Sequence, residues 1–374
     1  MARRSSTGHE RVSEAPIPAE QLDAAFPMLK LPIVPPYPPM EAKLMDEIPT
    51  GARWQYEPKW DGFRCLVFRD GDKVVLQSKA GQPLARYFPE LVDAVRALKA
   101  DRFVLDGEIV IEADGHLSFD DLLMRIHPAA SRITKLSKST PATLLVFDIL
   151  LDSKTRGNSV VKESLEVRRQ HLEAFFRSIR STRIKLSPTT TKLTDAERWM
   201  TELAATGCDG VIAKSLDEPY LSGERAMRKI KRIRTADCVV GGYRMASKGG
   251  AVGSLLLGLY DEDGKLNHVG FTSSFSLAER KKLKAILEPY EGGEGFTGNA
   301  PGGPSRWSTE RSAQWVPLAP KLVCEVRYDH FSGGRFRHGT KFLRWRPDKK
   351  PKACTYDQLS GAKGRNALNK LLAA

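Results

Sequence analysis

The pattern of apolar and polar positions changes character near Arg234, which divides the chain into two parts. Before that point, runs typical of strands alternate with runs typical of helices. The segments Arg64–Arg69 and Val74–Gln77 predict a hairpin, because a turn-forming Asp-Gly-Asp sequence separates them. The continuous apolar run Thr143–Leu151 predicts a strand that is buried on both faces.

Further elements are predicted within this first part. Two short apolar runs, Phe103–Leu105 and Ile109–Ile111, flank an Asp-Gly-Glu sequence, which places a carboxylate at a turn between two strands. The sequence Thr194-Asp195-Ala196-Glu197 has the spacing of a capping box and predicts the start of a helix that ends near Gly207. Another strand is predicted at Val211–Ala213.

After Arg234 the chain becomes a series of short strand-like runs separated by glycine-rich turns. Ser276-Leu277-Ala278-Glu279 predicts a capped helix to about Leu287, and the Gly- and Pro-rich segment Glu291–Ser305 predicts a loop. Five strands with one helix among them favour a small barrel of the OB-fold type, a common nucleic-acid-binding architecture. The predicted strands are Cys238–Tyr243, Ser254–Tyr260, Leu266–Phe271, Leu322–Tyr328 and Thr340–Trp345.

The length of 374 residues suits two domains in an α+β protein. We predict a mobile N-terminal segment at residues 1–25, a first domain at 26–234, and a second domain with a C-terminal tail at 235–374. The proline-rich segment Leu31–Pro39 is predicted to lie extended over the first domain, with docking onto a partner as the alternative.

Composition narrows the classes of function. The net charge of +14 favours a polyanionic partner, because neutralised phosphates release condensed counterions; a merely soluble basic protein is the alternative. No apolar run approaches the ~18 residues that span a bilayer, and no secretory signal is visible, so we expect no membrane association. The five cysteines contain no Cys-x-x-Cys pair, which disfavours a zinc ribbon and predicts reduced core residues.

The most informative chemical pattern surrounds Lys59, in the sequence Glu57-Pro58-Lys59-Trp60-Asp61-Gly62-Phe63-Arg64. A lysine that ends a strand-like run, two residues before Asp-Gly, provides an amine nucleophile that can be held beside a phosphate site. Asp61 can anchor the loop. Taken alone, Lys-x-Asp-Gly also fits a lysine in a hairpin turn, so the interpretation depends on the segments that follow.

Six further segments carry groups that a nucleotide site requires. Lys229 and Lys231 share one face of a predicted strand, because positions i and i+2 point the same way, and together they can neutralise a triphosphate. Phe147 is expected at the end of the buried apolar run. Each segment alone has an ordinary explanation as a solvated or core position. The six are Ser78-Lys79-Ala80-Gly81, Leu105-Asp106-Gly107-Glu108, Phe147-Asp148, Asp209-Gly210-Val211-Ile212-Ala213-Lys214, Met227-Arg228-Lys229-Ile230-Lys231, and Arg327-Tyr328-Asp329-His330 followed by Arg335 and Arg337.

In this order, the segments resemble the covalent nucleotidyltransferase superfamily and, within it, ATP-dependent DNA ligases, over about residues 30 to 350. The resemblance is to small bacterial ligases related to the ligase domain of end-joining enzymes. It implies an adenylyltransferase domain (an ATP-grasp-like nucleotidyltransferase) followed by an OB-fold β-barrel. It also implies a lysyl-AMP intermediate and the sealing of 3′-hydroxyl/5′-phosphate nicks in duplex DNA during repair, with ATP and Mg²⁺, or Mn²⁺ in its place.

The resemblance further implies how the nucleoside is held. Phe147 stacks on one face of adenine and Ile212 covers the other, while Glu57 helps to read the edge of the base. Arg64 and Glu108 hold the ribose.

Other implied roles concern the phosphates and the metal. Lys59 is the nucleophile, Asp61 and Lys231 are catalytic, and Glu108 and Asp209 are the candidate metal ligands. Nearby cations and desolvation are expected to depress the pKa of Lys59, so that its amine can attack. The remaining predicted nucleotide-binding residues are lysines of the first domain and members of the basic motif that swings over the pyrophosphate: Lys79, Lys214, Lys229, Lys231, Arg327, Asp329, Arg335 and Arg337.

Three positions depart from the family pattern. Lys79 stands where arginine is common, which keeps the charge but loses the bidentate fork toward a 5′-phosphate. Asp209 stands where glutamate is common, and its shorter side chain weakens the case for a direct metal contact. Met227 stands where an aromatic residue is usual.

Two other enzymes of the superfamily remain alternatives, an RNA ligase and an RNA capping guanylyltransferase. An inert nucleic-acid-binding OB protein is an alternative of a different class, although mere binding does not require a nucleophile. The missing zinc cysteines disfavour an NAD-dependent ligase. By resemblance, nicked duplex DNA is the expected partner of a monomeric, cytoplasmic, nucleoid-associated bacterial enzyme, delivered by a repair polymerase or an end-binding protein.

Overall fold

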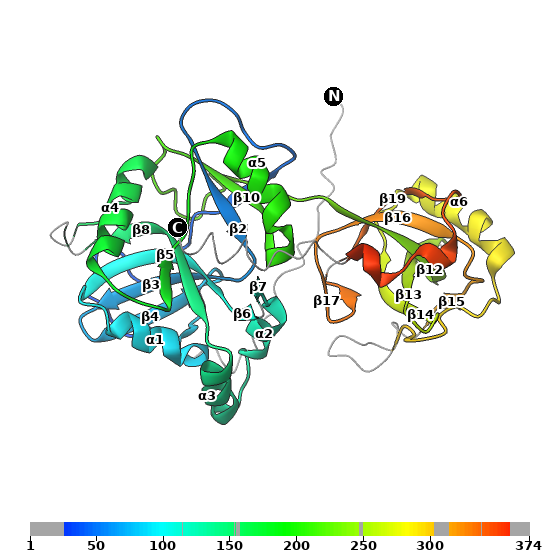
Figure 1. Ribbon diagram of the computed structural model, residues 1–374, viewed down its shortest axis with the longest axis horizontal. Coiled ribbons are helices and arrows are strands. Elements are labelled where there is room, and N and C mark those ends of the chain that lie inside the picture. The colour runs from blue at the N-terminus through cyan, green and yellow to red at the C-terminus, as the bar shows by residue number, and fades with distance from the viewer. Residues whose placement is uncertain are drawn as a thin grey trace.

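The computed structural model describes residues 26–359, except 114, 153, 155–157, 247–249, 303–313 and 338. The segment 1–25 that was predicted to be mobile, and the tail beyond 359, lie outside the described residues. The described chain forms two bodies, and the long strand β12 (Arg234–Met245) leads from the larger into the smaller (Figure 1). Helices and strands are mixed, as the α+β prediction requires.

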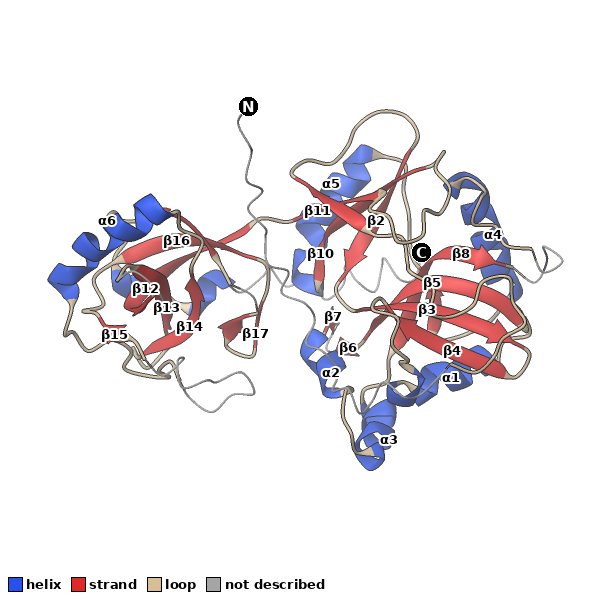
Figure 2. Ribbon diagram, turned by 180° about the vertical axis from the view of Figure 1, so that it is seen from behind, coloured by secondary structure: helices blue, strands red, loops and turns tan. Residues whose placement is uncertain are grey.

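The larger body contains two sheets that pack face to face (Figure 2). Apolar side chains of both sheets, including Val211 on one and Leu145 on the other, form a shared core between them. Its main strands are β1 (Ala42–Met45), β2 (Trp54–Trp60), β3 (Phe63–Asp70), β4 (Lys73–Ser78), β5 (Arg102–Val110), β8 (Thr143–Leu151), β9 (Ile184–Leu186), β10 (Cys208–Ser215) and β11 (Met227–Lys231). One sheet has the order β4-β3-β5-β8-β9 and the other the order β1-β11-β10-β2, so the predicted hairpin and the predicted buried strand are both confirmed.

Helices pack on the outer face of the five-stranded sheet and beside the four-stranded one. Leu91 of α1 and Phe175 of α4 belong to an apolar cluster with residues of β3 and β5. Trp199 of α5 packs with β2 and β10 instead. The helices of the larger body are α1 (Pro89–Arg96), α2 (Phe119–Met124), α3 (Ala130–Ser139), α4 (Leu165–Ser178) and α5 (Leu193–Glu202), and a two-stranded ribbon of β6 (Glu112–Ala113) and β7 (His116–Leu117) precedes α2.

A single strand replaces the two that were predicted around the Asp-Gly-Glu sequence. β5 runs unbroken between β3 and β8, so the predicted turn at Glu108 is wrong. Asp106 is tolerated inside the strand because its buried carboxylate pairs with Arg64, with an Nε–Oδ1 distance of 2.5 Å. Gly107 is required there, since a Cβ would lie 2.7 Å from the carbonyl oxygen of Leu145.

The helix before Gly207 begins differently from the prediction. Lys192 is the N-cap of α5 without a side-chain hydrogen bond, so the capping box predicted at Thr194-Asp195-Ala196-Glu197 is wrong and these residues lie within the first turns. In the loop before the helix, the hydroxyl of Thr190 accepts a hydrogen bond from the amide of Lys192 at 3.1 Å. The helix continues into a 3-10 turn at Leu203–Thr206. This helical segment ends at Gly207, which has a φ of 88°, as predicted.

The proline-rich segment Leu31–Pro39 is packed onto the larger body, as predicted. Leu31 and Ile33 are buried in a cluster with β3, β4 and β8. The side-chain amide of Gln77 bonds both to the backbone nitrogen of Tyr37 at 2.9 Å and to its carbonyl oxygen at 2.8 Å. This anchoring brings the following residues, Pro39–Ala42, to the edge of the space between the sheets.

The smaller body is a closed barrel, in agreement with the predicted OB-fold. Its sheet order is β14-β13-β12-β16-β19, and a parallel bridge from Thr272 to Thr340 joins the two ends. The capping box of α6 is confirmed, because Ser276 and Glu279 each bond to the other's backbone nitrogen. Besides β12, the elements are β13 (Val252–Tyr260), β14 (Leu266–Thr272), α6 (Leu277–Leu287), β15 (Val316–Pro317), β16 (Val323–Tyr328), β17 (Phe331–Ser332), β18 (Arg335–Phe336) and β19 (Lys341–Trp345).

Two predictions from composition can be compared with this fold. All five cysteines are buried and free, as expected for reduced core residues. Among the helices of the described residues, none has the length and apolar character needed to cross a membrane.

Candidate active site

A pocket opens between the two sheets of the larger body and gathers most of the predicted nucleotide-site residues. Strands β2, β10 and β11 contribute from one sheet, and β3, β5 and β8 from the other. Met40 and Glu41, which follow the proline-rich segment Leu31–Pro39, form part of its rim. The predicted residues that line it are Glu57, Lys59, Arg64, Lys79, Glu108, Phe147, Ile212, Lys214 and Lys229.

Lys59 lies near the end of β2, where it is paired with Gly210 of β10. The neighbouring residue on β10, Asp209, approaches closely, and the Nζ–Oδ2 distance is 3.2 Å. Next to it, Gly210 lets β10 lie close to β11, because its φ is +154° and a Cβ there would lie 2.0 Å from the carbonyl oxygen of Ile230. Both partners of the ion pair are largely buried, with side-chain exposures of 18% and 12%.

The electrostatic surroundings of Lys59 are acidic. Burial lowers the pKa of its ammonium group, but the negative charges of Asp209, Asp61 and Glu108 outweigh burial and raise it above 10.5. The prediction that neighbouring cations depress this pKa is therefore wrong for this structure. One reason is that Lys214 is already neutralised by Glu57, at 2.8 Å.

The three carboxyl groups around Lys59 differ in their protonation behaviour. Burial raises the pKa of Glu108 to about 8, although Arg64 and Lys59 act in the opposite direction. Burial and Asp209 likewise raise the pKa of Asp61 to about 6. Burial also opposes ionisation of Asp209, but Lys59 outweighs it, so the pKa of Asp209 is lowered. Asp209 is thus the carboxylate that stays charged most readily.

Another part of the pocket is built around Phe147. The ring lies in the middle of β8 rather than at its end, which corrects the prediction. The Arg64 guanidinium and the Lys214 ammonium each lie 4.5 Å from the ring centroid. Ile212 lines the same pocket from β10. An aromatic ring and an aliphatic side chain in one cleft are suited to holding a planar base.

Asp106 is a site residue that sequence reasoning did not single out. Its carboxylate binds both the Nε and the Nη2 of Arg64, at 2.5 and 2.6 Å, and accepts a hydrogen bond from the Tyr220 hydroxyl at 2.7 Å. This fork fixes the guanidinium that faces Phe147. A signal existed, because Asp106 and Glu108 are two positions apart on one strand and so point to the same side.

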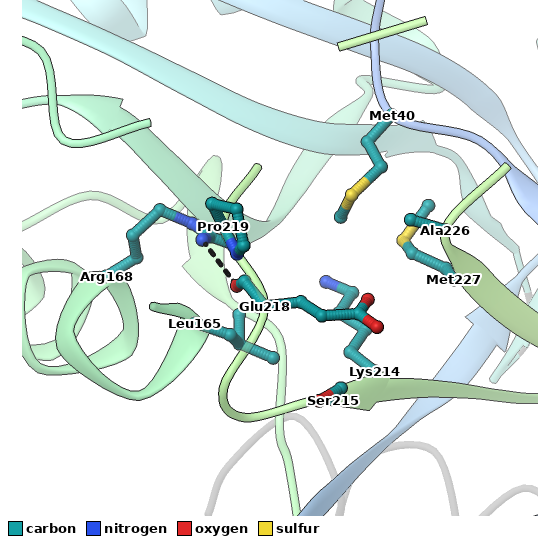
Figure 3. A pocket seen from close by; sticks show the side chains of 9 residues that line it. All are labelled: Met40, Leu165, Arg168, Lys214, Ser215, Glu218, Pro219, Ala226 and Met227. Atoms are coloured by element: carbon teal, nitrogen blue, oxygen red, sulfur yellow. Dashed lines mark hydrogen bonds between the residues drawn. The ribbon is translucent and has the colours of Figure 1, made fainter. Parts of the chain in front are cut away.

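A smaller cavity borders the nucleotide pocket and shares Met40, Lys214 and Met227 with it (Figure 3). Arg168 of α4 lies at its edge and binds the buried carboxylate of Asp148 through Nε at 2.8 Å and Nη2 at 3.1 Å. Because Asp148 follows Phe147 directly, this pair fixes the strand that carries the ring. The sequence carried no clear signal for Arg168, since charged residues of a helix usually face solvent.

The barrel contributes two charged side chains to the neighbourhood of Lys59. Arg337 forms a two-pronged contact with the carboxylate of Asp61, and its guanidinium lies 3.8 Å from the centroid of the Phe119 ring. Asp329 pairs with Lys231 at 2.9 Å. These two predicted nucleotide-binding residues of the barrel motif therefore reach the neighbourhood of Lys59, and His330 of the same motif lies beside Asp61, with 4.0 Å between Nδ1 and Oδ2.

The other two predicted residues of that motif lie elsewhere on the barrel. Arg327 is on β16, opposite Thr235 and Lys341, and Arg335 is exposed on β18. Neither is among the described residues that line the nucleotide pocket. Asp61, Asp209 and Lys231 also lie outside that lining, but the first two surround Lys59 and the third pairs with Asp329.

A candidate metal site lies where the two bodies meet. Asp61, Asp209 and His330 each offer a ligand atom, all within 4.8 Å of one another. Oδ1 of Asp209 is buried without a hydrogen-bond partner. A pair of carboxylates with an unpartnered oxygen fits a hard divalent cation. Of the two predicted metal ligands, Asp209 belongs to this cluster and Glu108 does not.

Comparison with known proteins agrees with this geometry. Residues 39–231 match the model of the ATP dependent DNA ligase domain, and residues 248–349 match that of the ATP dependent DNA ligase C terminal region. DNA ligase C1 of Mycolicibacterium smegmatis is 47% identical over 341 residues, which covers 88% of this chain and 96% of that protein. DNA ligase C of Mycobacterium tuberculosis is 44% identical over 348 residues, with the same two coverages. A solved structure of a Lig E DNA ligase has a TM-score of 0.51 at 16% identity, covers 82% of this chain and 99% of that one, and shows a common fold alone.

The two-domain fold, with a lysine beside a nucleotide pocket, defines an ATP-dependent enzyme of the nucleotidyltransferase type. The chain belongs to the ATP-dependent DNA ligases. This confirms the resemblance inferred from the sequence motifs and excludes the inert OB-fold binding protein. It also favours a DNA ligase over the RNA ligase and the capping guanylyltransferase.

Proposed function

We propose that Lys59 is the nucleophile of this DNA ligase and that it carries AMP through a phosphoramidate bond on Nζ. The observation that supports this most strongly is the position of Lys59, which lies near the end of β2 inside a pocket formed by both sheets, with its Nζ 3.2 Å from Oδ2 of Asp209. In the first step, Nζ attacks the α-phosphate of ATP and pyrophosphate leaves. The second step transfers AMP to the 5′-phosphate of a DNA nick. In the third, the 3′-hydroxyl attacks that phosphate and AMP is released.

The residues around Lys59 would divide the work by charge. Phe147, with Ile212 opposite, would hold the adenine, and Arg64 would hold the ribose while Asp106 keeps its guanidinium in place. Lys214, Lys229 and Lys231 are the cations available to the phosphates, and positioning with charge neutralisation dominates phosphoryl transfer. Arg327, Asp329, Arg335 and Arg337 remain the proposed contributions of the barrel.

Mg²⁺ is the proposed metal, with Mn²⁺ as a substitute. Asp209 and Asp61 would hold it, with Glu108 as a further ligand when the nucleotide is bound. When bound, the cation supplies positive charge that offsets the carboxylates and the phosphates. The acidic surroundings that raise the pKa of Lys59 are therefore the same groups that a metal would neutralise.

DNA repair is the proposed process. The multifunctional non-homologous end joining DNA repair protein LigD of Mycobacterium tuberculosis is 32% identical over 312 residues, which covers 80% of this chain and 37% of that protein. We also propose that the domain boundary lies at residue 234, that the enzyme is a monomer in the bacterial cytoplasm at the nucleoid, and that a repair polymerase or an end-binding protein delivers it to DNA.

Labelling with α-³²P-ATP tests the nucleophile directly. The wild-type protein is expected to acquire a label that is acid-labile and alkali-stable, as a phosphoramidate is, and Lys59→Ala is expected to acquire none. Lys99→Ala, an exposed lysine that follows α1 on the far side of the five-stranded sheet, is the matched control and should label normally. Label on the Lys59→Ala protein would overturn the assignment. Parallel incubation with GTP and with nicked RNA measures the specificity for ATP and DNA.

A further inference from the structure

Glu41 lies at the rim of the nucleotide pocket, with its backbone held in place and its carboxylate between two cations. Its backbone is held on both sides, because its nitrogen donates to the Glu224 carbonyl at 2.7 Å and its carbonyl accepts from the Met227 nitrogen at 3.1 Å. The carboxylate then meets two cations at the same oxygen. Lys79 Nζ and Arg225 Nε each lie 3.6 Å from Oε2 of Glu41.

Two cations that converge on one carboxylate oxygen define a small anion site. Its contacts of 3.6 Å are longer than hydrogen bonds, so Glu41 fills this site loosely. Exposed ion pairs of this kind contribute little to stability, and Glu41 is 31% exposed, so its side chain can turn to solvent at small cost. An incoming phosphate carries more charge and more acceptor oxygens than a carboxylate, and it would therefore compete well for the two cations.

The exposure of the two cations indicates which phosphate this is. The side chains of Lys79 and Arg225 are 51% and 61% exposed, whereas Lys59 is 18% exposed. Lys79 lines the nucleotide pocket, and Arg225 lies outside the described lining. The anion site thus lies at the exposed rim of the pocket that holds the buried Lys59, where a DNA strand can approach from solvent.

We propose that Lys79 and Arg225 hold a phosphate of the nicked DNA strand at the mouth of the pocket, and that Glu41 occupies this anion position until the DNA displaces it. The inference deepens the proposed function, on which it rests. It adds Arg225 as a DNA contact and makes Glu41 an internal competitor of the substrate. It also explains how a lysine can serve at position 79, where related ligases commonly have arginine. Arg225 supplies the second contact to the phosphate that the two-pronged guanidinium of an arginine would make.

Binding of nicked duplex DNA to the full-length, pre-adenylated enzyme tests the proposal. Affinities are measured by fluorescence polarisation at several salt concentrations for the wild type, Arg225→Ala, Glu41→Gln and the double variant. We expect Arg225→Ala to weaken binding about three- to tenfold and to reduce the salt-dependence slope by about one. Glu41→Gln should tighten binding about two- to fivefold, and this gain should shrink in the Arg225→Ala background.

Controls separate the proposal from general charge effects. Lys99→Ala and Glu47→Gln remove exposed charges of the same sign away from the anion site, and they should leave DNA affinity within about twofold of the wild type. A nick with a 5′-hydroxyl identifies the phosphate. If Arg225→Ala loses its effect on that nick, the terminal phosphate is held, and if the effect persists, an internal one is held; both outcomes support the site.

Two results would overturn the proposal. One is an Arg225→Ala protein whose DNA affinity and salt slope equal those of the wild type. The other is an Arg225→Ala protein whose KM for ATP in self-adenylation is raised while its DNA binding is unchanged, which would assign the anion site to the nucleotide. Wild-type labelling at Lys59 is measured in the same preparations, so a failure of the anion site is distinguished from a failure of the proposed nucleophile.

Discussion

Arg337 of the barrel donates two guanidinium N–H groups to the two carboxylate oxygens of Asp61, which lies 276 positions earlier in the chain. Asp61 stands two residues after Lys59, so the contact connects the second body directly to the loop that follows Lys59. Both side chains are mostly buried, with exposures of 17% and 11%. A buried fork of this kind holds the two bodies in one relative arrangement, with the barrel close to the nucleotide pocket.

The first prediction concerns this contact. Arg337→Ala should slow self-adenylation about ten- to hundredfold at saturating ATP, because hydrogen bonds to charged groups contribute about 1.5–3 kcal/mol. The self-adenylation rate of Arg337→Lys should lie between the rates of Arg337→Ala and the wild type, since lysine keeps the charge but cannot make the two-pronged contact. The rate of label transfer from α-³²P-ATP measures the effect. Arg344→Ala, at a position on β19 that is 63% exposed, is the matched control, and equal losses in both variants would contradict the special role of Arg337.

The second prediction concerns the protonation of Lys59. Asp209→Asn removes the largest of the negative charges that raise the pKa of Lys59, so this pKa should fall. The measurement is the pH dependence of Lys59 modification by an amine-selective reagent, followed by peptide mass spectrometry without added metal. Glu47→Gln should leave the profile unchanged. A profile of Asp209→Asn that coincides with the wild type would show that Asp209 does not control the amine.

The third prediction is a pH dependence of stability caused by Glu108. Burial raises the pKa of its carboxyl from 4.5 to about 8, so the folded state binds a proton that the unfolded state releases above pH 4.5. Its contribution to the free energy of unfolding is therefore complete below pH 4.5 and declines as the pH rises to about 8. Glu108→Gln removes this decline.

Thermal unfolding of the two proteins without ligand tests that sign. The Tm of Glu108→Gln minus that of the wild type should increase steadily from pH 4.5 to pH 8 and then level off. A difference that stays constant over this range would show that the carboxyl titrates at its ordinary pKa in the folded protein. Glu47→Gln, an exposed glutamate, should give a flat difference.

The fourth prediction concerns the base. Phe147→Ala should raise the KM for ATP in self-adenylation about tenfold or more, because stacking of a base on an aromatic ring contributes ~1–3 kcal/mol. Phe147→Tyr keeps the ring and should remain close to the wild type. Initial rates of pyrophosphate release at varied ATP measure both. An unchanged KM for Phe147→Ala would mean that the ring supports β8 without contacting the base.

Local patterns in the sequence were sufficient for most of the fold. The hairpin of β3 and β4, the buried strand β8 and the capped helix α6 follow from periodicity and capping, which are properties of neighbouring residues. The turn predicted at Glu108 failed because a distant residue, Arg64, neutralises Asp106 within a central strand. The capping box predicted for α5 failed because the helix begins earlier, directly after Lys192, whose amide is bonded to Thr190 of the preceding loop.

For the active site, the chain order of chemical groups and its resemblance to ATP-dependent DNA ligases already singled out Lys59 as the proposed nucleophile, together with the candidate ring and the cations. The charge state of Lys59, the contact of Asp61 with Arg337 and the placement of Glu41 between Lys79 and Arg225 became visible only in the folded chain. Each of these depends on burial or on the distance between charges far apart in sequence. Electrostatic energies vary steeply with both, and neither is encoded in a local pattern.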